Sequence, residues 1–219
     1  MAIIEVSNVT KAFKGLTIFQ GIHVQFEKGR IYGIVGPNGS GKSVLFKLIC
    51  GFIRPDSGEV LIHPDYQEKG ANFPKNIGII IDRPGYLDNI TGFENLKRLA
   101  IIQNIISDQE IRQALQTVGL DPDAKQKVRN YSLGMKQKLS LAQAIMENKE
   151  VLILDEPFNA LDQDSVSNIR QLLLDFKSQG KTIILTSHNQ EDIDLLCDEV
   201  YRINQQKLEK VVELVDSSN

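Results

Sequence analysis

The sequence predicts an α/β fold with a mostly parallel core sheet, an antiparallel β subdomain and an inserted helical subdomain. Short, continuously apolar runs bounded by turn residues are typical of strands that are covered on both faces. Segments whose apolar residues recur at helical spacing separate these runs. One stretch, residues 22–26, instead alternates apolar and polar side chains, which indicates a half-buried antiparallel strand. Strands that alternate with helices favour a parallel core sheet.

The composition fits one α/β domain in a reducing cytosol. The chain has 219 residues and a net charge of −3, which gives no electrostatic reason to expect nucleic acid as a partner. Cys50 and Cys197 lack CxxC spacing, so neither a disulfide framework nor a zinc site is expected. The N-terminus lacks the layout of a secretion signal, and no apolar run approaches the ~18 residues of a membrane helix. If the protein works at a membrane, another polypeptide is expected to span it.

The first part of the chain is expected to alternate strands with one helix. The helix places Val44 and Leu48 on one apolar face, directly after a glycine-rich segment. Residues 55–58, Pro-Asp-Ser-Gly, are a strong turn signal before the next strand. The strands expected here cover residues 22–26, 31–35, 59–62 and 77–81.

Residues 88–147 are helical in character. An apolar stripe through Leu96 and Ala100 predicts the first helix, and Ser107 with Glu110 has the capping-box spacing that starts the second. A third helix is expected from about residue 133 to 146. We therefore expect one domain, in which a helical subdomain over residues 88–147 is inserted into a core formed by residues 1–87 and 148–219.

The last part returns to buried strands, over residues 151–154 and 182–186. A stripe through Ile169 and Leu173 predicts the helix between them. Residues 199–211 have the pattern of a hairpin, although its turn lacks the usual glycine.

Residues 36–43, Gly-Pro-Asn-Gly-Ser-Gly-Lys-Ser, lie between a predicted strand and a predicted helix, as a phosphate-binding loop requires. Glycines let the backbone wrap closely around an anion, and the helix adds its positive end. Lys42 is expected to reach the β and γ phosphates, and the Ser43 hydroxyl to ligate Mg²⁺. The sequence therefore predicts a nucleoside triphosphate site. The residues expected to hold the nucleotide here are Gly36, Asn38, Gly39, Ser40, Gly41, Lys42, Ser43 and Val44.

Three polar residues follow two of the buried strands. Asp155 and Glu156 end one strand, and His188 follows another. Ligands of doubly wound sheets lie beyond the carboxyl ends of the strands, so these side chains are expected at the nucleotide. Asp155 is expected to hold Mg²⁺ opposite Ser43, and Glu156 to orient or deprotonate the attacking water. His188 is expected to contact the γ phosphate.

A second helix start lies at Ser132. Its hydroxyl is expected to cap the helix, and the N–H groups behind it could form another anion site. An ordinary capped helix has the same spacing, so the residues alone leave both interpretations open.

The order and spacing of these motifs resemble those of the ATP-binding subunit of ABC transporters, over residues 3–212. Residues 36–43 are similar to the Walker A loop, and residues 151–156 to the Walker B strand with its catalytic glutamate. Residues 159–162, Asn-Ala-Leu-Asp, are similar to the D-loop, and His188 to the switch histidine.

This resemblance implies roles for three further residues. Phe13 occupies the place of the aromatic side chain that stacks on adenine. Ser132 and Gly134 match the signature motif, which in this family caps the ATP held by the Walker motifs of another copy. The implied ligands are ATP and Mg²⁺, and the implied assembly is a homodimer when ATP is bound.

The chain departs from the family pattern at three positions. Leu133 and Met135 stand where the signature usually has a glycine and a glutamine. Asp82 stands where most relatives have the Q-loop glutamine. A carboxylate there can ligate Mg²⁺ or hold the attacking water, but it adds negative charge beside Asp155 and Glu156. Residues 82–92 and the Ser-x-Gly-Met signature resemble the subgroup that exports bacitracin-like and lantibiotic peptides.

Three other classes of protein fit this sequence less well. Residues 82–85, Asp-Arg-Pro-Gly, match the DxxG pattern of a GTPase, but the only Asn-Lys pair is followed by Glu-Val and not by the Asp that guanine needs. The second class is an ABC ATPase that does not act in transport. Those that act on ribosomes generally carry two cassettes in one chain, and those that act in repair carry long coiled-coil insertions. This sequence shows neither feature. A binding module without turnover conflicts with Glu156 and His188.

The sequence thus predicts an ATP-hydrolysing subunit of an ABC transporter. It is expected to dimerise around two ATP molecules and to power export, of an antimicrobial peptide or related compound, through a separate transmembrane permease. Its expected location is cytoplasmic, at the inner face of the cell membrane.

Overall fold

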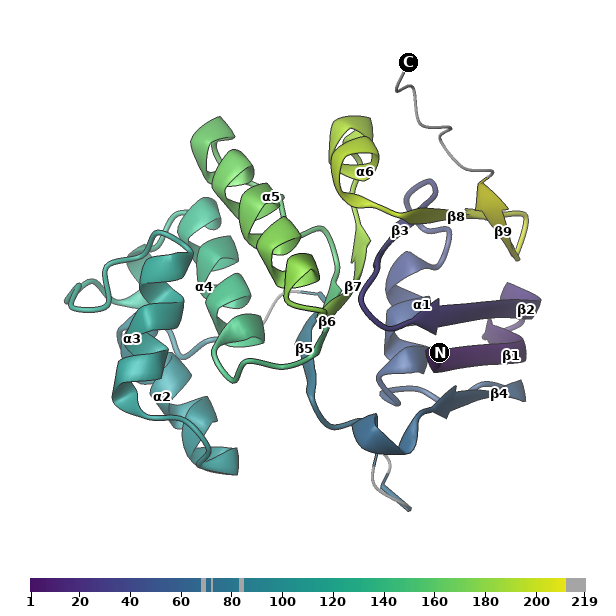
Figure 1. Cartoon of the computed structure of the whole chain (residues 1–219), viewed down its shortest axis with the longest axis horizontal. Helices are drawn as coiled ribbons and strands as arrows, with labels where there is room; N and C mark the ends of the chain where they lie inside the picture. The colour runs from purple at the N-terminus through teal and green to yellow at the C-terminus, as the bar shows by residue number, and fades with distance from the viewer. Residues whose placement is uncertain (68–69, 72, 83–84, 212–219) are drawn as a thin grey trace.

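The computed structural model describes residues 1–67, 70–71, 73–82 and 85–211 and contains two β-sheets with helices on both sides of the larger one (Figure 1). The strands are β1 (Ala2–Phe13), β2 (Leu16–Glu27), β3 (Ile31–Val35), β4 (Ser57–Ile62), β5 (Ile77–Ile80), β6 (Val151–Leu154), β7 (Thr182–Thr186), β8 (Glu199–Asn204) and β9 (Lys207–Val211). The α-helices are α1 (Lys42–Ile49), α2 (Gly92–Gln103), α3 (Asp108–Thr117), α4 (Leu133–Ile145), α5 (Gln163–Ser178) and α6 (Gln190–Leu196).

The larger sheet has the strand order β5-β6-β7-β3-β8-β9. Its first five strands are parallel and β9 returns antiparallel to β8, so the predicted mostly parallel sheet is confirmed. Parallel pairing brings the carboxyl ends of β3, β5, β6 and β7 to the same edge. β5 lies at one side of the sheet, and Ile79 on it is only half-buried, whereas residues 77–81 were expected to be covered on both faces.

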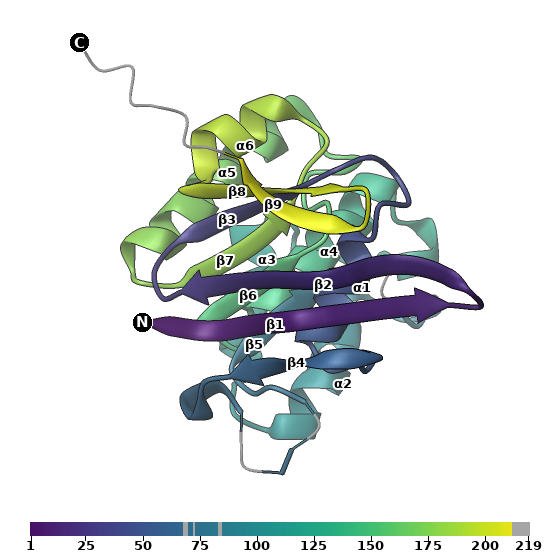
Figure 2. The same ribbon diagram turned by 90° about the vertical axis from the view of Figure 1, so that its right-hand side faces the viewer.

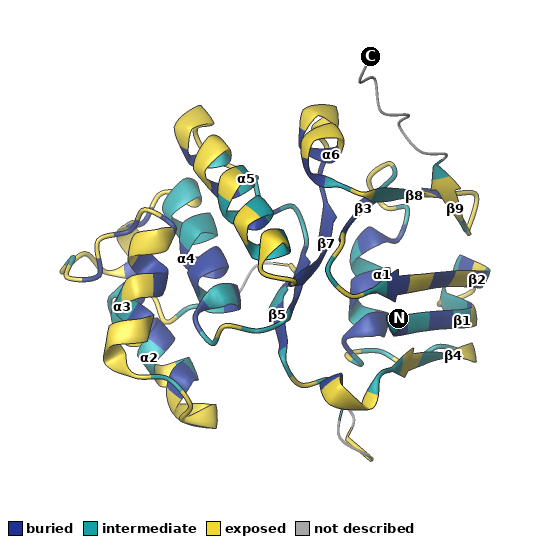
Figure 3. Ribbon diagram, in the orientation of Figure 1, coloured by how far each residue is buried: buried dark blue, intermediate teal, exposed yellow. Residues whose placement is uncertain are grey.

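Successive residues of the central strands enter two separate hydrophobic clusters. Leu152 and Leu154 of β6 pack with α4, α5 and α6, while Val151 and Ile153 pack with α1 and the smaller sheet. This follows from the two-residue period of a strand and explains why these runs are apolar throughout. Figure 3 shows β7, in the middle of the larger sheet, in the dark blue of buried residues, whereas β9 at its edge is intermediate or exposed.

The smaller sheet is antiparallel, with the order β2-β1-β4, and α1 lies between it and the larger sheet (Figures 1 and 2). The predicted alternation at Ile22, Val24 and Phe26 is confirmed, because these three side chains are buried toward α1. The sequence pattern did not single out β1, since register shifts between Val6 and Val9 interrupt its alternation.

The helices of residues 92–145 pack on one another beside the larger sheet. The predicted capping box of α3 is confirmed, since Ser107 and Glu110 bond each other's backbone N–H groups. α2 begins at Gly92 and not near residue 88, because Thr91 and Glu94, which have the same spacing as Ser107 and Glu110, form a second capping box. Leu96 and Ala100 of α2 and Ile111 of α3 share a cluster with α4.

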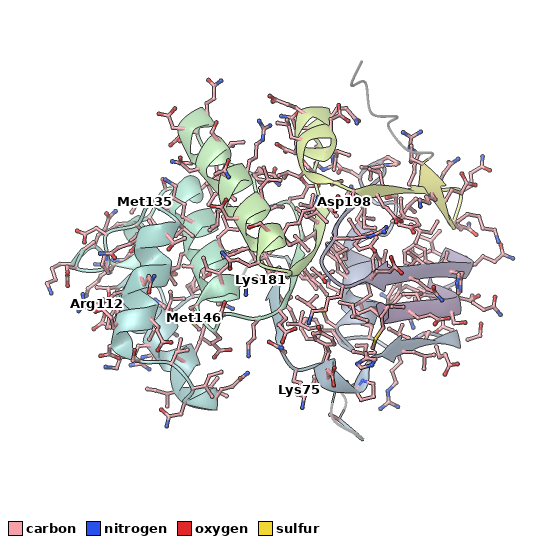
Figure 4. The ribbon with its side chains drawn as sticks, viewed as in Figure 1. Lys75, Arg112, Met135, Met146, Lys181 and Asp198 are labelled. Atoms are coloured by element: carbon pink, nitrogen blue, oxygen red, sulfur yellow. The ribbon has the colours of Figure 1, made fainter. Side chains whose placement is uncertain are left out.

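The junction between α4 and the core is held by the ammonium group of a buried lysine. Lys181 Nζ, just before β7, donates to Asn148 Oδ1 at 2.8 Å and to the carbonyl of Lys149 at 2.6 Å (Figure 4). Burial lowers the pKa of Lys181 from its ordinary value. The three acceptors around it, which include the Asn148 carbonyl, fix the place where the chain leaves the helices and enters β6.

The C-terminal hairpin of β8 and β9 confirms the prediction for residues 199–211. Its turn residues Gln205 and Gln206 both have positive φ, 44° and 68°. Two such residues match the twist of a two-residue hairpin loop, which is why the missing glycine does not prevent the turn. Residues 212–219, which the predicted core included, lie outside the described part of the chain.

Within the described residues, no helix combines the length and the apolar character needed to cross a membrane.

β5 and α4 approach each other at Gly78. A Cβ atom added at Gly78 would lie 2.0 Å from the carbonyl oxygen of Ala144, closer than any real contact. We expect Gly78→Ala to lower the free energy of unfolding by roughly 1–3 kcal/mol, because the strand and helix must separate. Urea denaturation measures this, with Gly85→Ala as the control, since a Cβ at Gly85 meets nothing within 4 Å. Equal urea midpoints for the two variants would contradict the prediction.

Candidate functional site

The glycine-rich segment between β3 and α1 borders a cavity of about 260 Å³ at the carboxyl edge of the larger sheet. Most of the residues predicted to bind nucleotide gather here, while Gly36 and Ser40 lie in the loop without lining the cavity. The lining residues are Ile18, Asn38, Gly39, Gly41, Lys42, Ser43, Val44, Asp155, Glu156 and His188. The loop therefore meets the ends of β6 and β7 in space, as the sequence predicted.

Gly41 shapes the loop where α1 begins. Its φ of 112° lies in the region that favours glycine, and a Cβ there would come within 2.7 Å of Ile18 Cγ2. Behind it, the Ser40 hydroxyl oxygen is buried and has no hydrogen-bond partner among the described residues. A tight loop that leads into a helix N-terminus presents N–H groups and the positive end of the helix, which suits a phosphate.

Lys42 places a cation inside this loop. Its side chain is 8% exposed, and Nζ donates to the carbonyl of Gly36 at 2.9 Å. The ammonium group is thus held against the loop backbone at the cavity and can attract phosphate oxygens there.

Asp155 is bonded from both sides by hydroxyl groups. Ser43 Oγ donates to one carboxylate oxygen, and Thr186 Oγ1 donates to the other at 2.8 Å. Mg²⁺ prefers oxygen ligands, and it commonly combines one or two protein oxygens with water and phosphate oxygens. The neighbouring Ser43 hydroxyl and Asp155 carboxylate offer such oxygens. Among the described residues, no group of three or more acidic, histidine or cysteine side chains is placed to hold a metal ion.

Glu156 carries a partly buried carboxylate in a strained backbone. Its φ is 51°, unusual for a residue other than glycine, and its N–H donates to Thr186 Oγ1 at 2.8 Å. His188 Nε2 lies 3.0 Å from Glu156 Oε1, an ion-pair distance without the angle of a hydrogen bond. Burial raises the pKa of Glu156, and the charges of His188 and Lys42 oppose that rise. A carboxylate of raised basicity beside the phosphate loop can orient or deprotonate a water.

Asp82, which was predicted to be a metal ligand, points toward Lys47 and not into the loop cavity. Its carboxylate pairs with Lys47 Nζ of α1 at 2.7 Å and is 59% exposed. It does not line the loop cavity, but with Asp155 and Glu156 it lines a second cavity, of about 400 Å³, toward α4. Of the stretch 82–92 that resembles peptide exporters, residues 83 and 84 lie outside the described residues.

Three other predicted residues lie apart from the loop cavity. Ser132 caps α4, where its Oγ accepts from the Met135 N–H at 3.1 Å, and Gly134 lies against the carbonyl of Ala160. Phe13 is exposed at the end of β1, with Lys11 Nζ 5.1 Å from its ring centre. In one copy of the chain, these residues are not brought to the cavity.

The sequence patterns missed two residues of this site. Thr186 connects Asp155 and Glu156, and Ile18 forms an apolar wall of the cavity. The signal for Thr186 was a hydroxyl residue at the last position of a buried strand, next to the carboxyl edge. Ile18 lies in β2 and carried no such signal, because only the packing of the two sheets brings it near the loop.

Several known proteins are similar to this chain in sequence. The family model described as "ABC transporter" matches residues 19–159. An uncharacterized ABC transporter ATP-binding protein, YybJ of Bacillus subtilis, is 44% identical over 98% of this chain and all of the relative. Bacitracin transport ATP-binding protein BcrA of Enterococcus faecalis is 38% identical over 90% of this chain and 64% of its own length. Lantibiotic transport ATP-binding protein SrtF of Streptococcus pyogenes is 32% identical, over 89% of this chain and 84% of the relative.

The fold is also found in a solved structure. A dimeric, post-hydrolysis structure of the ATP-binding cassette MJ0796, bound to ADP and Pi, superposes with a TM-score of 0.82. The match covers 94% of this chain and 98% of that one, at 22% identity, which establishes the shared fold.

Lys42→Ala tests the loop cavity as the phosphate site. We expect affinity for a nucleoside triphosphate to fall roughly 10–100-fold, because a hydrogen bond to a charged group contributes about 1.5–3 kcal/mol. Isothermal titration calorimetry measures it. Lys47→Ala is the matched control, since Lys47 lies on the same helix but pairs with Asp82 and not with the loop. Equal losses in both variants would assign the effect to overall charge and remove Lys42 from the site.

Proposed function

This chain belongs to the ABC transporter family, and from that premise we propose that two copies of it close around Mg²⁺-bound ATP and power export through a separate membrane subunit. Membership of the family makes the chain an ATP-binding, ATP-hydrolysing subunit of a transporter, as the sequence predicted. A transport role is accordingly favoured over the alternative of a non-transport ATPase, and the GTPase interpretation is wrong.

The observation that carries the proposed mechanism is the bonded set at the carboxyl edge of the sheet. Ser43, Asp155 and Thr186 come from α1, β6 and β7, yet one hydrogen-bond network joins them beside Lys42. Phosphate oxygens in the loop would meet the Lys42 ammonium and the first N–H groups of α1. Ser43 and Asp155 would hold Mg²⁺, which when bound offsets the negative charge of the phosphates.

Glu156 is proposed as the group that orients the attacking water and takes its proton. Burial raises its pKa, which makes its carboxylate a stronger base than one in water. His188, whose Nε2 lies 3.0 Å from that carboxylate, would hold it in place and contact the γ phosphate. Both residues line the same cavity as the loop, and they follow the adjacent strands β6 and β7.

The second half of the proposed site comes from another copy. Ser132 and Gly134 do not line the loop cavity of their own chain, and Ser132 and Leu133 are exposed at the start of α4. The N–H groups of that helix end are suited to a phosphate held by a neighbour. If each copy lends its α4 to the other, the interface is two-fold symmetric and forms two equivalent ATP sites. Phe13, exposed on β1, is proposed to stack on the adenine.

The names of the relatives support a proposal for the class of compound that is transported. BcrA is named as a bacitracin transport ATP-binding protein and SrtF as a lantibiotic transport ATP-binding protein. We propose that this chain likewise serves export of an antimicrobial peptide or related compound. It would then bind the inner face of the cell membrane through its permease. Asp82 is proposed to act in coupling or at the metal only after it leaves Lys47.

Glu156→Gln tests the catalytic role. We expect ATP binding to be kept and turnover to fall on the order of 10²-fold or more, because the amide cannot accept the proton of the water. Phosphate release and calorimetry measure the two quantities, and an ATP-loaded dimer should accumulate in gel filtration. Glu209→Gln, on exposed β9, is the control and should keep full turnover. Wild-type turnover in Glu156→Gln would remove Glu156 from the mechanism.

Ser132→Arg tests the contribution of the second copy. We expect the variant to bind ATP as a monomer with unchanged affinity, since Ser132 does not line the cavity of its own chain. Its ATP-dependent dimer, trapped with Glu156→Gln, should be lost, because the arginine would fill the space of the phosphate contact. Gel filtration with and without ATP measures it, and Ser178→Arg, at the end of α5, is the control. An ATP-dependent dimer that persists in Ser132→Arg would contradict the proposal that Ser132 contributes to the ATP site of the other copy.

A further inference from the structure

Gln137 of α4 bridges the helix to the turn that carries Glu156. Its Nε2 donates to the carbonyl of Glu156 at 3.1 Å and to the carbonyl of Pro157 at 3.0 Å. Gln137 also lines the cavity toward α4, on the side of Glu156 away from the phosphate loop. Figure 4 places Met135 at the start of α4 and Met146 just beyond its end, so Gln137 lies in the first turns of the helix.

The backbone at Glu156 needs outside support. A φ of 51° is disfavoured for glutamate and persists only where neighbouring groups fix it. Its N–H donates to Thr186 Oγ1 at 2.8 Å, and its carbonyl accepts from Gln137. The two peptide groups that flank the Glu156 Cα are thus held from opposite sides, one by β7 and one by α4.

We propose that Gln137 is a positioning residue for the reaction: its amide fixes the strained turn after β6 and so aims the Glu156 carboxylate at the phosphate loop. This proposal rests on the proposed role of Glu156. Gln137 does not line the loop cavity, and in this proposal it acts only through the backbone of Glu156 and Pro157.

The same contact links the two ATP sites of the proposed dimer. Gln137 is five residues beyond Ser132, about 7.5 Å along the helix axis. Ser132 would contact the ATP of the partner copy, while Gln137 holds the Glu156 that acts on the ATP of its own copy. A shift of α4 on closure therefore moves both ends of this connection together. Binding of ATP in the partner's site would thus change the position of Glu156 in the other site through the first turns of α4.

A purely structural role for Gln137 predicts different behaviour. Loss of an anchor between α4 and the core would lower the stability of the fold and weaken ATP binding along with turnover. A positioning role predicts loss of kcat with little change in ATP affinity, because a misaimed catalytic group leaves the phosphate loop intact. The two roles are therefore separable by measurement.

The experiment is a double-mutant cycle of Gln137→Met with Glu156→Gln in the full chain. In the wild-type background we expect Gln137→Met to lower kcat about tenfold and to leave the Kd for ATP within about twofold. In the Glu156→Gln background we expect Gln137→Met to cause no further loss of the residual turnover, since the group that it positions is already absent. Gln143→Met is the matched control on the same helix, because neither turn carbonyl accepts a bond from Gln143 in the described structure.

Gln137→Glu provides a second variant of the same size that loses both donors, should Gln137→Met prove unfolded by circular dichroism. Equal fractional losses in both backgrounds, or a fall in ATP affinity that matches the fall in kcat, would overturn the positioning role. Wild-type turnover in Glu156→Gln alone would instead defeat the proposed function, so the two failures are distinct.

Discussion

The site depends on one carboxylate held between hydroxyl groups from two different elements. Asp155 ends β6 and is bonded by Ser43 at the start of α1 and by Thr186 at the end of β7. These elements are far apart in the sequence, and they meet because β6, β7 and β3 are parallel neighbours whose carboxyl ends share one edge. The phosphate loop, the proposed Mg²⁺ ligands and the acid proposed to orient the water thus share one support, the carboxyl edge of the larger sheet.

Strained backbone occurs just after β5 and β6. Asp82 follows β5, Glu156 follows β6, and Ala160 lies in the next turn, and all three have φ between 51° and 62°. Residues other than glycine adopt this conformation at a cost that the surrounding contacts must offset. At Glu156 these contacts come from Thr186 and Gln137, so both the larger sheet and α4 contact this backbone.

Asp82 adds a third carboxylate near the candidate site, and a lysine side chain pairs with it. Three carboxylates, Asp82, Asp155 and Glu156, line one cavity, and their mutual repulsion would disfavour all three charges. Lys47 pairs with Asp82, and Lys42 lies near Glu156, so two of the three carboxylates have a cation close to them. The third, Asp155, is bonded by the hydroxyl groups of Ser43 and Thr186. The Lys47 pair is exposed and therefore weak, of the order of 1 kcal/mol or less, which leaves Asp82 free to change partners.

The sequence by itself determined the α/β class, the phosphate loop and the acids after β6, because each depends on local spacing: glycine positions, strand period and cap residues. It also sufficed for the family, since its motifs recur in a fixed order. Only the tertiary structure decided that Asp82 pairs with Lys47, that Thr186 joins Asp155 to Glu156, and that Gln137 holds the turn. Those contacts join residues whose proximity comes from strand order and helix packing, which no local pattern encodes.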